Sequence, residues 1–167
     1  MKDGGNPYRG FLYAGLMICK EEPYLIEYNV RMGDPECQVL MMRLKTDLLE
    51  IIDLATKDKL KNLKIEWTKE NCLTVVLCAK GYPGNYIKNS ELKNLNMVYL
   101  NINNQVFHAG TYEKDKKIFS SGGRVLSVTS MGVDLIEARK KALQNLENIK
   151  WDDGFFRKDI GWRAIKK

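Results

Sequence analysis

The side chains of residues 24–31 follow a repeat of two, with apolar residues on one face and, apart from Leu25, polar residues on the other, and this repeat limits the fold more than any other feature of the chain. The apolar members are Tyr24, Ile26, Tyr28 and Val30. A repeat of two residues predicts a β-strand, because side chains in a strand point alternately to opposite faces. The other face carries Glu27, Asn29 and Arg31 in one row, with roughly 6.6 Å between successive side chains.

Two oxygen donors and one permanent cation in a single row suit a metal ion and a phosphate group. Mg²⁺ prefers oxygen ligands and is commonly held by one or two carboxylates plus nucleotide phosphates. Glu27 and Asn29 could supply the protein ligands, and the planar guanidinium of Arg31 could bind two oxygens of a phosphoryl or carboxylate group. An edge strand with a solvated polar face shows the same alternation, so the pattern alone leaves both interpretations open.

The strand is followed by Gly-Asp-Pro-Glu, a sequence typical of a turn that leads into a helix. Gly33 tolerates unusual backbone angles, Asp34 is a good N-cap, and Pro35 suits the first helical position. Free N–H groups at the helix start could bind an anion, although Asp34 and Glu36 place negative charge there. These two carboxylates could contact a small substrate, or they could simply cap the helix.

The rest of the first region predicts a hairpin and helices. Residues 11–18 form a short apolar segment that would pair with the strand after it, giving an antiparallel hairpin. Helical spacing follows over residues 39–60, with a division near Thr46, where Asp47 and Glu50 resemble a capping box. Charge-rich residues follow, and we predict the domain boundary among them, which gives domains 1–60 and 61–167.

The second region mixes strands with one clear helix. The almost continuously apolar run Cys72–Ala79 predicts a strand buried on both faces. An apolar stripe over residues 133–149 predicts a helix. Further strands are predicted at 97–100, 105–111, 117–120 and 124–129.

Two residues of the second region are candidates for function. His108 lies in a predicted strand without a Ser, Cys or carboxylate at motif spacing, so we interpret it as structural. Arg124 follows two glycines, Gly122 and Gly123, which would allow a phosphate to approach the backbone while the arginine binds it. A hairpin turn followed by a surface arginine explains the same sequence equally well.

The composition excludes several classes of protein. The net charge of +6 comes without a nucleic-acid-binding motif, so we predict no nucleic-acid partner. The four cysteines lack the spacing of a zinc site and the density of a disulfide scaffold, which fits a reducing cytoplasm. No segment resembles a signal peptide or a membrane span, so we expect a soluble cytoplasmic protein that does not bind membranes.

Two stretches, Tyr13–Ile18 and Ile26–Gln38, strongly resemble the glycinamide ribonucleotide synthetase family of phosphoribosylamine–glycine ligases, which belongs to the ATP-grasp superfamily. The resemblance continues in the family's order through Gly81–Gly84, Phe107–Thr111, Gly122–Leu126 and Phe155–Gly161. It implies an α+β fold. The first part would be the C-terminal portion of an ATP-grasp domain, with antiparallel strands plus a helix, and a small mixed α/β C-terminal domain would follow.

The resemblance also implies a reaction and its site. ATP would phosphorylate glycine to glycyl phosphate, and the amine of 5-phosphoribosylamine would displace the phosphate, in de novo purine biosynthesis. Glu27 and Asn29 would bind Mg²⁺ or Mn²⁺, Arg31 would be catalytic, and Ile26 would lie near the adenine of ATP. The substrate contacts would be Asp34, Glu36 and Arg124.

Nothing before Tyr13 resembles the glycine-rich loop and lysines with which this superfamily grips ATP. We therefore expect the chain to be the C-terminal part of the enzyme, inactive alone, with its partner the N-terminal ATP-binding half. Met1 would be an internal methionine or the start of a split subunit. Two alternatives remain open: a non-catalytic binding module that kept the fold, and another ATP-grasp ligase such as a carboxylase.

Overall fold

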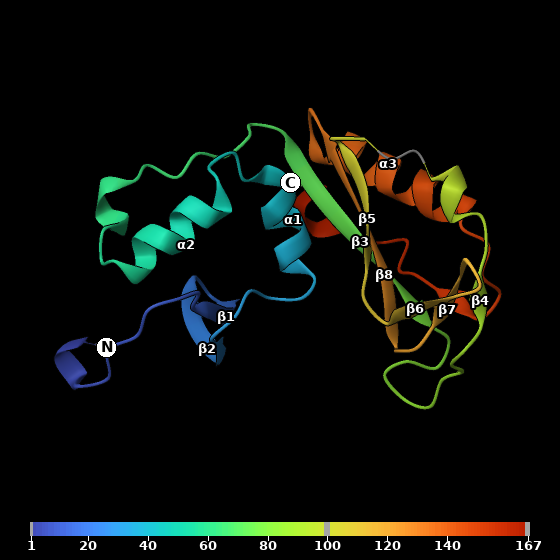
Figure 1. Cartoon of the computed structure of the whole chain (residues 1–167), viewed down its shortest axis with the longest axis horizontal. Helices are drawn as coiled ribbons and strands as arrows, with labels where there is room; N and C mark the ends of the chain where they lie inside the picture. Colours follow the sequence, from blue (N-terminus) through green and yellow to red (C-terminus); the bar gives the residue numbers. More distant parts are fainter. Residues whose placement is uncertain (1, 99–100, 166–167) are drawn as a thin grey trace. The chain divides into compact units, whose positions relative to one another are not determined.

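The computed structural model describes residues 2–98 and 101–165, and its backbone divides into two units (Figure 1). Unit 1 comprises Met1–Cys37 and Leu44–Thr68, and unit 2 comprises Gln38–Arg43 and Lys69–Lys167. This division follows backbone packing, so the family boundary between residues 60 and 61 stays a prediction. Among the described residues, no helix has both the length and the apolar character needed to cross a lipid bilayer.

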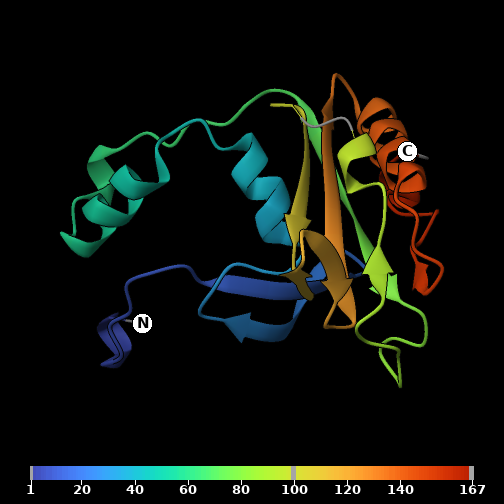
Figure 2. The ribbon, with the colours of Figure 1, turned by 45° about the vertical axis from the view of Figure 1, so that its right-hand side comes forward.

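Unit 1 contains the predicted hairpin, formed by β1 (Tyr13–Cys19) and β2 (Glu22–Asn29) (Figure 2). The strands are antiparallel and are joined by Lys20 and Glu21, whose φ angles are +51° and +68°. Positive φ at both central residues is the requirement of a two-residue type I′ turn, whose twist matches that of the flanking strands. The turn is therefore two residues long, and Glu22 already belongs to β2.

The predicted division of the helical segment is confirmed. Helix α1 (Glu36–Arg43) ends before Thr46, and α2 (Leu48–Thr56) begins after it. The Asp47 side chain caps α2 by accepting the N–H of Leu49 at 2.7 Å, an interaction usually worth about 1 kcal/mol. Between the helices, the Thr46 hydroxyl accepts a backbone N–H from residue 66 at 2.7 Å, which ties the break to the following segment. Short 3-10 helices are η1 (Lys2–Gly4) and η2 (Leu60–Asn62).

An apolar cavity of about 480 Å³ lies within unit 1, between residues 9–12 and α2. Its lining includes Phe11, Leu12, Ile51, Ile52, Ala55 and Ile65. Arg9 closes one side, because its guanidinium donates to the carbonyl of Thr56 at 3.1 Å and pairs with the carboxylate of Asp58. The segment before β1 is thus held against α2 by polar contacts around an apolar interior.

Unit 2 is built on a four-stranded antiparallel sheet in the order β5-β8-β3-β9. The strands are β3 (Asn71–Ala79), β5 (Asn104–His108), β8 (Arg124–Gly132) and β9 (Gly154–Phe155). Helix α3 (Leu135–Asn148) packs along one face of β3 and β8 (Figure 1). The core between them contains Leu73, Val75, Leu77, Leu126, Val128, Ala138, Ala142 and Leu146.

The first turn of α3 is capped by two carboxylates, and the predicted helix is confirmed. Asp134 accepts the N–H of Glu137 at 2.8 Å, and Glu137 accepts the N–H of Val133 at 2.7 Å. Glu137 also pairs with Lys141 at 3.0 Å. The hydrogen bond from Val133, followed by that from Lys141, lowers the pKa of Glu137. This reciprocal pattern is a capping arrangement that fixes where the helix begins.

A second sheet in unit 2 has three short strands in the order β4-β7-β6. They are β4 (Glu91–Leu92), β6 (Thr111–Lys114) and β7 (Lys117–Ser120), and short helices are η3 (Leu95–Met97) and α4 (Trp162–Ile165). The predicted strand 105–111 is wrong as one strand, because residues 109 and 110 separate β5 from β6. In the predicted strand 97–100, Met97 ends η3 instead, and residues 99 and 100 lie outside the described residues.

The prediction that β3 is buried on both faces is wrong for one face. Leu73, Val75 and Leu77 are buried, whereas the alternate residues are only half-buried. The half-buried residues are Cys72, Thr74, Val76 and Cys78. The strand is apolar throughout because it is central in its sheet, but only the face under α3 is fully covered along its length.

Burial gives Cys72 a testable acid–base property. Partial burial raises the pKa of the Cys72 thiol to about 11, although the nearby Arg43 opposes the shift. At pH 8 about one thiol in a thousand would be ionised, and the thiolate is the reactive form. We expect Cys72 to react with a thiol reagent at least about tenfold more slowly than exposed Cys19. Peptide mapping by mass spectrometry after timed labelling would measure both rates, and equal rates would contradict the burial of Cys72.

The same pKa shift predicts how stability depends on pH. The pKa of Cys72 in the folded chain lies above the ordinary value of 9.0, so the native state holds this proton more tightly than the unfolded chain does. The resulting contribution to the free energy of unfolding is complete below pH 9 and is lost as the pH rises toward 11. A Cys72→Ser variant should show a smaller loss of stability over this range, measured by urea unfolding.

Candidate functional site

The register of the hairpin places the two predicted metal ligands on one face. Glu27 lies opposite Gly15, and Asn29 lies opposite Tyr13. Directly opposed residues of an antiparallel pair project from the same face, and so do residues two apart in one strand. Glu27, Asn29, Gly15 and Tyr13 therefore share one face at the end of β2.

The Glu27 side chain lies across Gly15 and is free to bind a cation. A Cβ atom placed at Gly15 would lie 3.1 Å from the Cγ atom of Glu27, so the stem of the glutamate occupies the space above the glycine. Glu27 is exposed. Its carboxylate accepts no hydrogen bond and forms no ion pair within residues 2–98 and 101–165, so its charge is not neutralised by the described part of the chain.

Asn29 has a buried amide atom without a partner. Its Nδ2 atom is shielded from solvent and makes no hydrogen bond to the described residues. A buried polar atom of this kind needs a partner, since desolvation is otherwise uncompensated. A half-turn of the amide about its Cβ–Cγ bond presents the oxygen at the same place, where it could bind a cation.

The donor set fits a metal whose shell is completed by other groups. Within the described part of the chain, no three His, Cys, Asp or Glu side chains come together to hold a metal ion. Glu27 and Asn29 supply one carboxylate and one amide oxygen, which is a small share of an octahedral shell. Mg²⁺ sites that use nucleotide phosphates and water have this composition.

The predicted row of three residues is wrong, because the ladder ends before Arg31. The last pair joins Tyr13 and Asn29. The Tyr8 hydroxyl lies 2.9 Å from the carbonyl oxygen of Phe11 and 3.4 Å from that of Val30, and it can donate to either one where the next pairs would form. Arg31 then turns back and donates to the carbonyl of residue 32 at 2.8 Å. Its catalytic role stays a prediction.

The turn after β2 ends at Pro35, and α1 begins at Glu36, one residue later than predicted. The carbonyl of Gly33 accepts the N–H of Cys37 at 2.9 Å, and this hydrogen bond closes the turn before the helix. Gly33 does not have a positive φ angle. A Cβ atom at Gly33 would lie 2.3 Å from a carboxylate oxygen of Glu36, which is the movable end of that side chain, and 3.2 Å from the Tyr13 ring. Asp34 and Glu36 are both exposed beside this turn.

Tyr13 is the residue of this site that sequence reasoning missed. A Cβ atom at Gly15 would lie 3.6 Å from one edge of the Tyr13 ring, and a Cβ atom at Gly33 would lie 3.2 Å from the other edge. The ring therefore lies between the two glycines and connects the face of Glu27 to the turn that carries Glu36. An aromatic residue two positions before a glycine in a strand is the signal that could have indicated it, since aromatic rings cover strand glycines.

Ile26 lies at the register shift of the hairpin, between the pairs Gly15–Glu27 and Leu16–Leu25. The shift puts Tyr24 and Tyr28 on opposite faces, so the predicted apolar row along one face of the strand is wrong. The side chain of Ile26 is apolar and 64% exposed, which is the character needed to pack against a planar ring. The contact between Ile26 and adenine stays a prediction.

Arg124 belongs to unit 2, and the two glycines before it have a packing role. A Cβ atom at Gly122 would lie 3.1 Å from the Cα atom of Gly110, and one at Gly123 would lie 2.1 Å from the Tyr82 ring. The carbonyl of Arg124 accepts the N–H of Gly110 at 2.9 Å. The glycines thus bring two backbone segments and an aromatic ring together. Contact between Arg124 and a substrate stays a prediction.

His108 makes a local hydrogen bond. Its Nδ1 atom lies 2.9 Å from the hydroxyl of Thr111, which joins the end of β5 to the start of β6. The imidazole is exposed and has a partner in its own connection. This arrangement agrees with the structural interpretation of His108.

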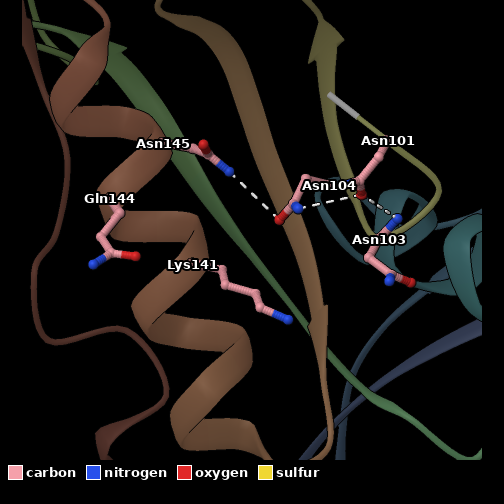
Figure 3. Close-up of a pocket in the computed structure, with 6 residues that line it drawn as sticks. All are labelled: Asn101, Asn103, Asn104, Lys141, Gln144 and Asn145. Carbon is pink, nitrogen blue, oxygen red and sulfur yellow. Dashed lines mark hydrogen bonds between the residues drawn. The ribbon is translucent and has the colours of Figure 1, made fainter. Parts of the chain in front are cut away.

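A polar cavity of about 290 Å³ lies in unit 2, between α3 and residues 101–104 (Figure 3). Asn145 donates to Asn104 at 3.4 Å, and Asn104 donates to the side chain of Asn101 at 3.3 Å. Asn104 and Asn145 are both buried. Their carboxamides satisfy one another in a chain from the helix to the turn, so the cluster ties α3 to the start of β5, and none of the predicted site residues belongs to it.

Both parts of the chain match models of known protein families. Residues 72–163 match the model described as Phosphoribosylglycinamide synthetase, C domain, and residues 1–37 match Phosphoribosylglycinamide synthetase, ATP-grasp (A) domain. A phosphoribosylamine–glycine ligase of Brucella melitensis is 47% identical over 167 residues, which cover 100% of this chain. The chain spans 39% of the length of that relative.

Solved structures agree with the fold. The match to a crystal structure of phosphoribosylamine–glycine ligase from Thermotoga maritima has a TM-score of 0.79 and 35% sequence identity. It covers 95% of this chain and 38% of the Thermotoga chain. A second match, to the crystal structure of Kluyveromyces lactis urea carboxylase, covers 88% of this chain and 14% of the carboxylase chain, with a TM-score of 0.59 and 18% identity. At this identity the match shows only that the two share a fold. The predicted α+β class is confirmed.

Proposed function

Since this chain belongs to the phosphoribosylglycinamide synthetase family, we propose that it is the C-terminal part of a phosphoribosylamine–glycine ligase. The observation that carries the proposal is the match to the A-domain and C-domain models in their order along one chain. The reaction would join glycine to 5-phosphoribosylamine at the expense of ATP, in purine biosynthesis. The A-domain match covers residues 1–37, and we propose that this stretch is the end of the ATP-grasp domain.

The reaction proceeds through an activated carboxylate. A carboxylate oxygen of glycine attacks the γ-phosphate of ATP, which releases ADP and forms glycyl phosphate. The amine of 5-phosphoribosylamine then attacks the carbonyl carbon, the C–O bond to phosphate breaks, and the amine loses a proton as the amide forms. Most of the catalysis in such a sequence comes from positioning the reactants and stabilising charge on the phosphate oxygens.

The residues of this chain would take distinct parts. Glu27 and Asn29 would hold Mg²⁺ or Mn²⁺, which when bound neutralises charge on the phosphates. Ile26, at the bulge of the hairpin, would pack near adenine. Arg31 would bind the transferred phosphoryl group or the glycine carboxylate. The remaining substrate contacts would be Asp34, Glu36 and Arg124.

The exposed apolar side chains of the hairpin support the proposal that a partner carrying the ATP-binding half covers them. A two-stranded hairpin is at best marginally stable alone in water. Both faces of this hairpin expose large apolar side chains: Leu16, Met17, Ile18, Tyr24, Leu25, Ile26 and Tyr28. Such a surface is typical of an interaction site. The N-terminal half of the same enzyme would cover it, and the four free cysteines suit a reducing cytoplasm as the site of the reaction.

Complementation tests the proposed function. We expect no ADP release above background from this chain alone, because it spans only 39% of the length of the ligase that it matches. Adding a separately produced ATP-binding half of the family should give ADP release that requires both glycine and 5-phosphoribosylamine. Omitting each substrate in turn is the control. ADP release from the chain alone would contradict the proposal. If the two pieces are folded and bind each other but release no ADP, a non-catalytic module would be favoured.

A further inference from the structure

The position opposite Glu27 has no side chain, and this absence shapes the site. Opposed Cβ atoms in an antiparallel pair are usually 4.5–5.5 Å apart, and each side chain normally stands beside its partner. Because Gly15 has no Cβ atom, the stem of Glu27 fills the place that its partner would occupy. The gap is narrow, since a Cβ atom at Gly15 would lie 3.1 Å from Cγ of Glu27 and 3.6 Å from Cε1 of Tyr13.

Space, and not backbone conformation, is the reason for a glycine at position 15. Its φ angle is not positive, so any residue could adopt its backbone angles. The register shifts directly after Gly15, between it and Leu16. Such a bulge changes the local twist and re-aims side chains, and bulges are frequent beside functional sites. An alanine would fit the backbone of this bulge but would press against Glu27.

We propose that Gly15 is a positioning residue that holds the Glu27 carboxylate in the direction needed to bind the metal, on the face shared with Asn29. The slot has the backbone of Gly15 as its floor and the Tyr13 ring as one wall. A Cβ atom at position 15 would displace the stem of Glu27 and so redirect its carboxylate. This inference rests on the proposed function of Glu27.

The test uses the complete ligase and the variant Gly15→Ala. We expect the apparent affinity for Mg²⁺ to fall by about tenfold or more, as is usual when a group that orients a metal ligand is lost. Turnover at saturating Mg²⁺ should change much less, because Glu27 remains present. Binding of Mn²⁺ in the presence of ADP, measured by electron paramagnetic resonance, should weaken in parallel and gives a readout independent of turnover.

Two comparisons make the result decisive. Gly4→Ala is the matched control, because a Cβ atom at Gly4 has nothing within 4 Å. Gly15→Ala is also made in a Glu27→Ala background, where no Cγ atom is present to meet the new methyl group. There the added effect of Gly15→Ala on Mn²⁺ affinity should shrink, which is the coupling that a double-mutant cycle measures.

Each outcome bears on one claim. A wild-type ligase without Mg²⁺-dependent ADP release would reject the proposed function itself. If the wild type is active, an unchanged Mn²⁺ affinity in Gly15→Ala overturns the positioning role. An effect of the same size in the Glu27→Ala background also overturns it, because the alanine at position 15 would then act without touching the glutamate stem.

Discussion

The variant Glu27→Gln of the complete ligase is expected to lose about a hundredfold or more of its kcat/KM at low Mg²⁺. Glutamine keeps the size of the side chain but removes the charge that a divalent cation needs in its shell. Only Asn29 would remain as a protein ligand on this face, so the cation and the phosphates it binds would be held poorly. Initial rates of ADP release over a series of free Mg²⁺ concentrations would measure the loss.

Glu22→Gln is the control for this experiment. Glu22 lies at the opposite end of β2 and is exposed, so the same chemical change there leaves the site intact. Its dependence on Mg²⁺ should match that of the wild type. If Glu27→Gln also matched the wild type at low Mg²⁺, the assignment of Glu27 as a metal ligand would be wrong.

The variant Gly110→Ala should destabilise unit 2 by about 3 kcal/mol. A Cβ atom at Gly110 would lie 2.6 Å from the Cα atom of Gly122 and 2.7 Å from the carbonyl oxygen of Arg124. Both are backbone atoms, the first in the turn before β8 and the second in the first residue of β8, so a rotation of a side chain cannot relieve the overlap. Domains of this kind are stable by only 5–15 kcal/mol, so the loss is large. Urea unfolding followed by tryptophan fluorescence would measure it, since Trp151 is buried.

Two other glycines give a graded comparison. A Cβ atom at Gly122 would lie 3.1 Å from the Cα atom of Gly110, so Gly122→Ala should cost less than Gly110→Ala. Gly4→Ala should cost close to nothing, because its surroundings are open. If the urea midpoints of Gly110→Ala and Gly4→Ala agreed, the close approach of the two backbone segments would be contradicted.

Local patterns in the sequence were sufficient for the elements whose cause is local. Helix α3 was predictable because its apolar stripe and its cap at Asp134 lie within the segment itself. The hairpin was predictable because two apolar segments adjoin a short polar turn. Asp47 marked the start of α2 for the same reason, since an N-cap acts on residues two and three positions ahead.

The end of β2 was not predictable, because its cause is distant in sequence. The alternation of polar and apolar residues continues to Arg31, but the Tyr8 hydroxyl lies beside the carbonyls of Phe11 and Val30. A contact between residues that are 22 positions apart leaves no periodic signal. The division of the predicted strand at Gly110 has a similar origin, because its neighbours there are Gly122 and Arg124.

The candidate site likewise contains residues that could be predicted from the sequence and residues that could not. Glu27 and Asn29 could be named from strand spacing together with a family resemblance, and the register places both on one face. Tyr13 and Gly15 could not be given roles, because their importance depends on what lies across the hairpin. The Gly122-Gly123 pair could be read in two ways from sequence, and in the structure it contacts Gly110 and Tyr82.

The pairing of β3 with β8 bears on the order in which unit 2 assembles. More than forty residues separate the end of β3 from the start of β8, so joining these strands closes a long loop and carries a large entropic cost. Strands β6 and β7 are joined by two residues and can pair within microseconds, which shortens the remaining loop. Helix α3 directly follows β8 in the chain and can form early, but its apolar face is fully covered only after β3 has paired with β8. We therefore expect the pairing of β3 with β8 to be slower than the formation of the β6–β7 hairpin, which shortens the loop that this pairing must close.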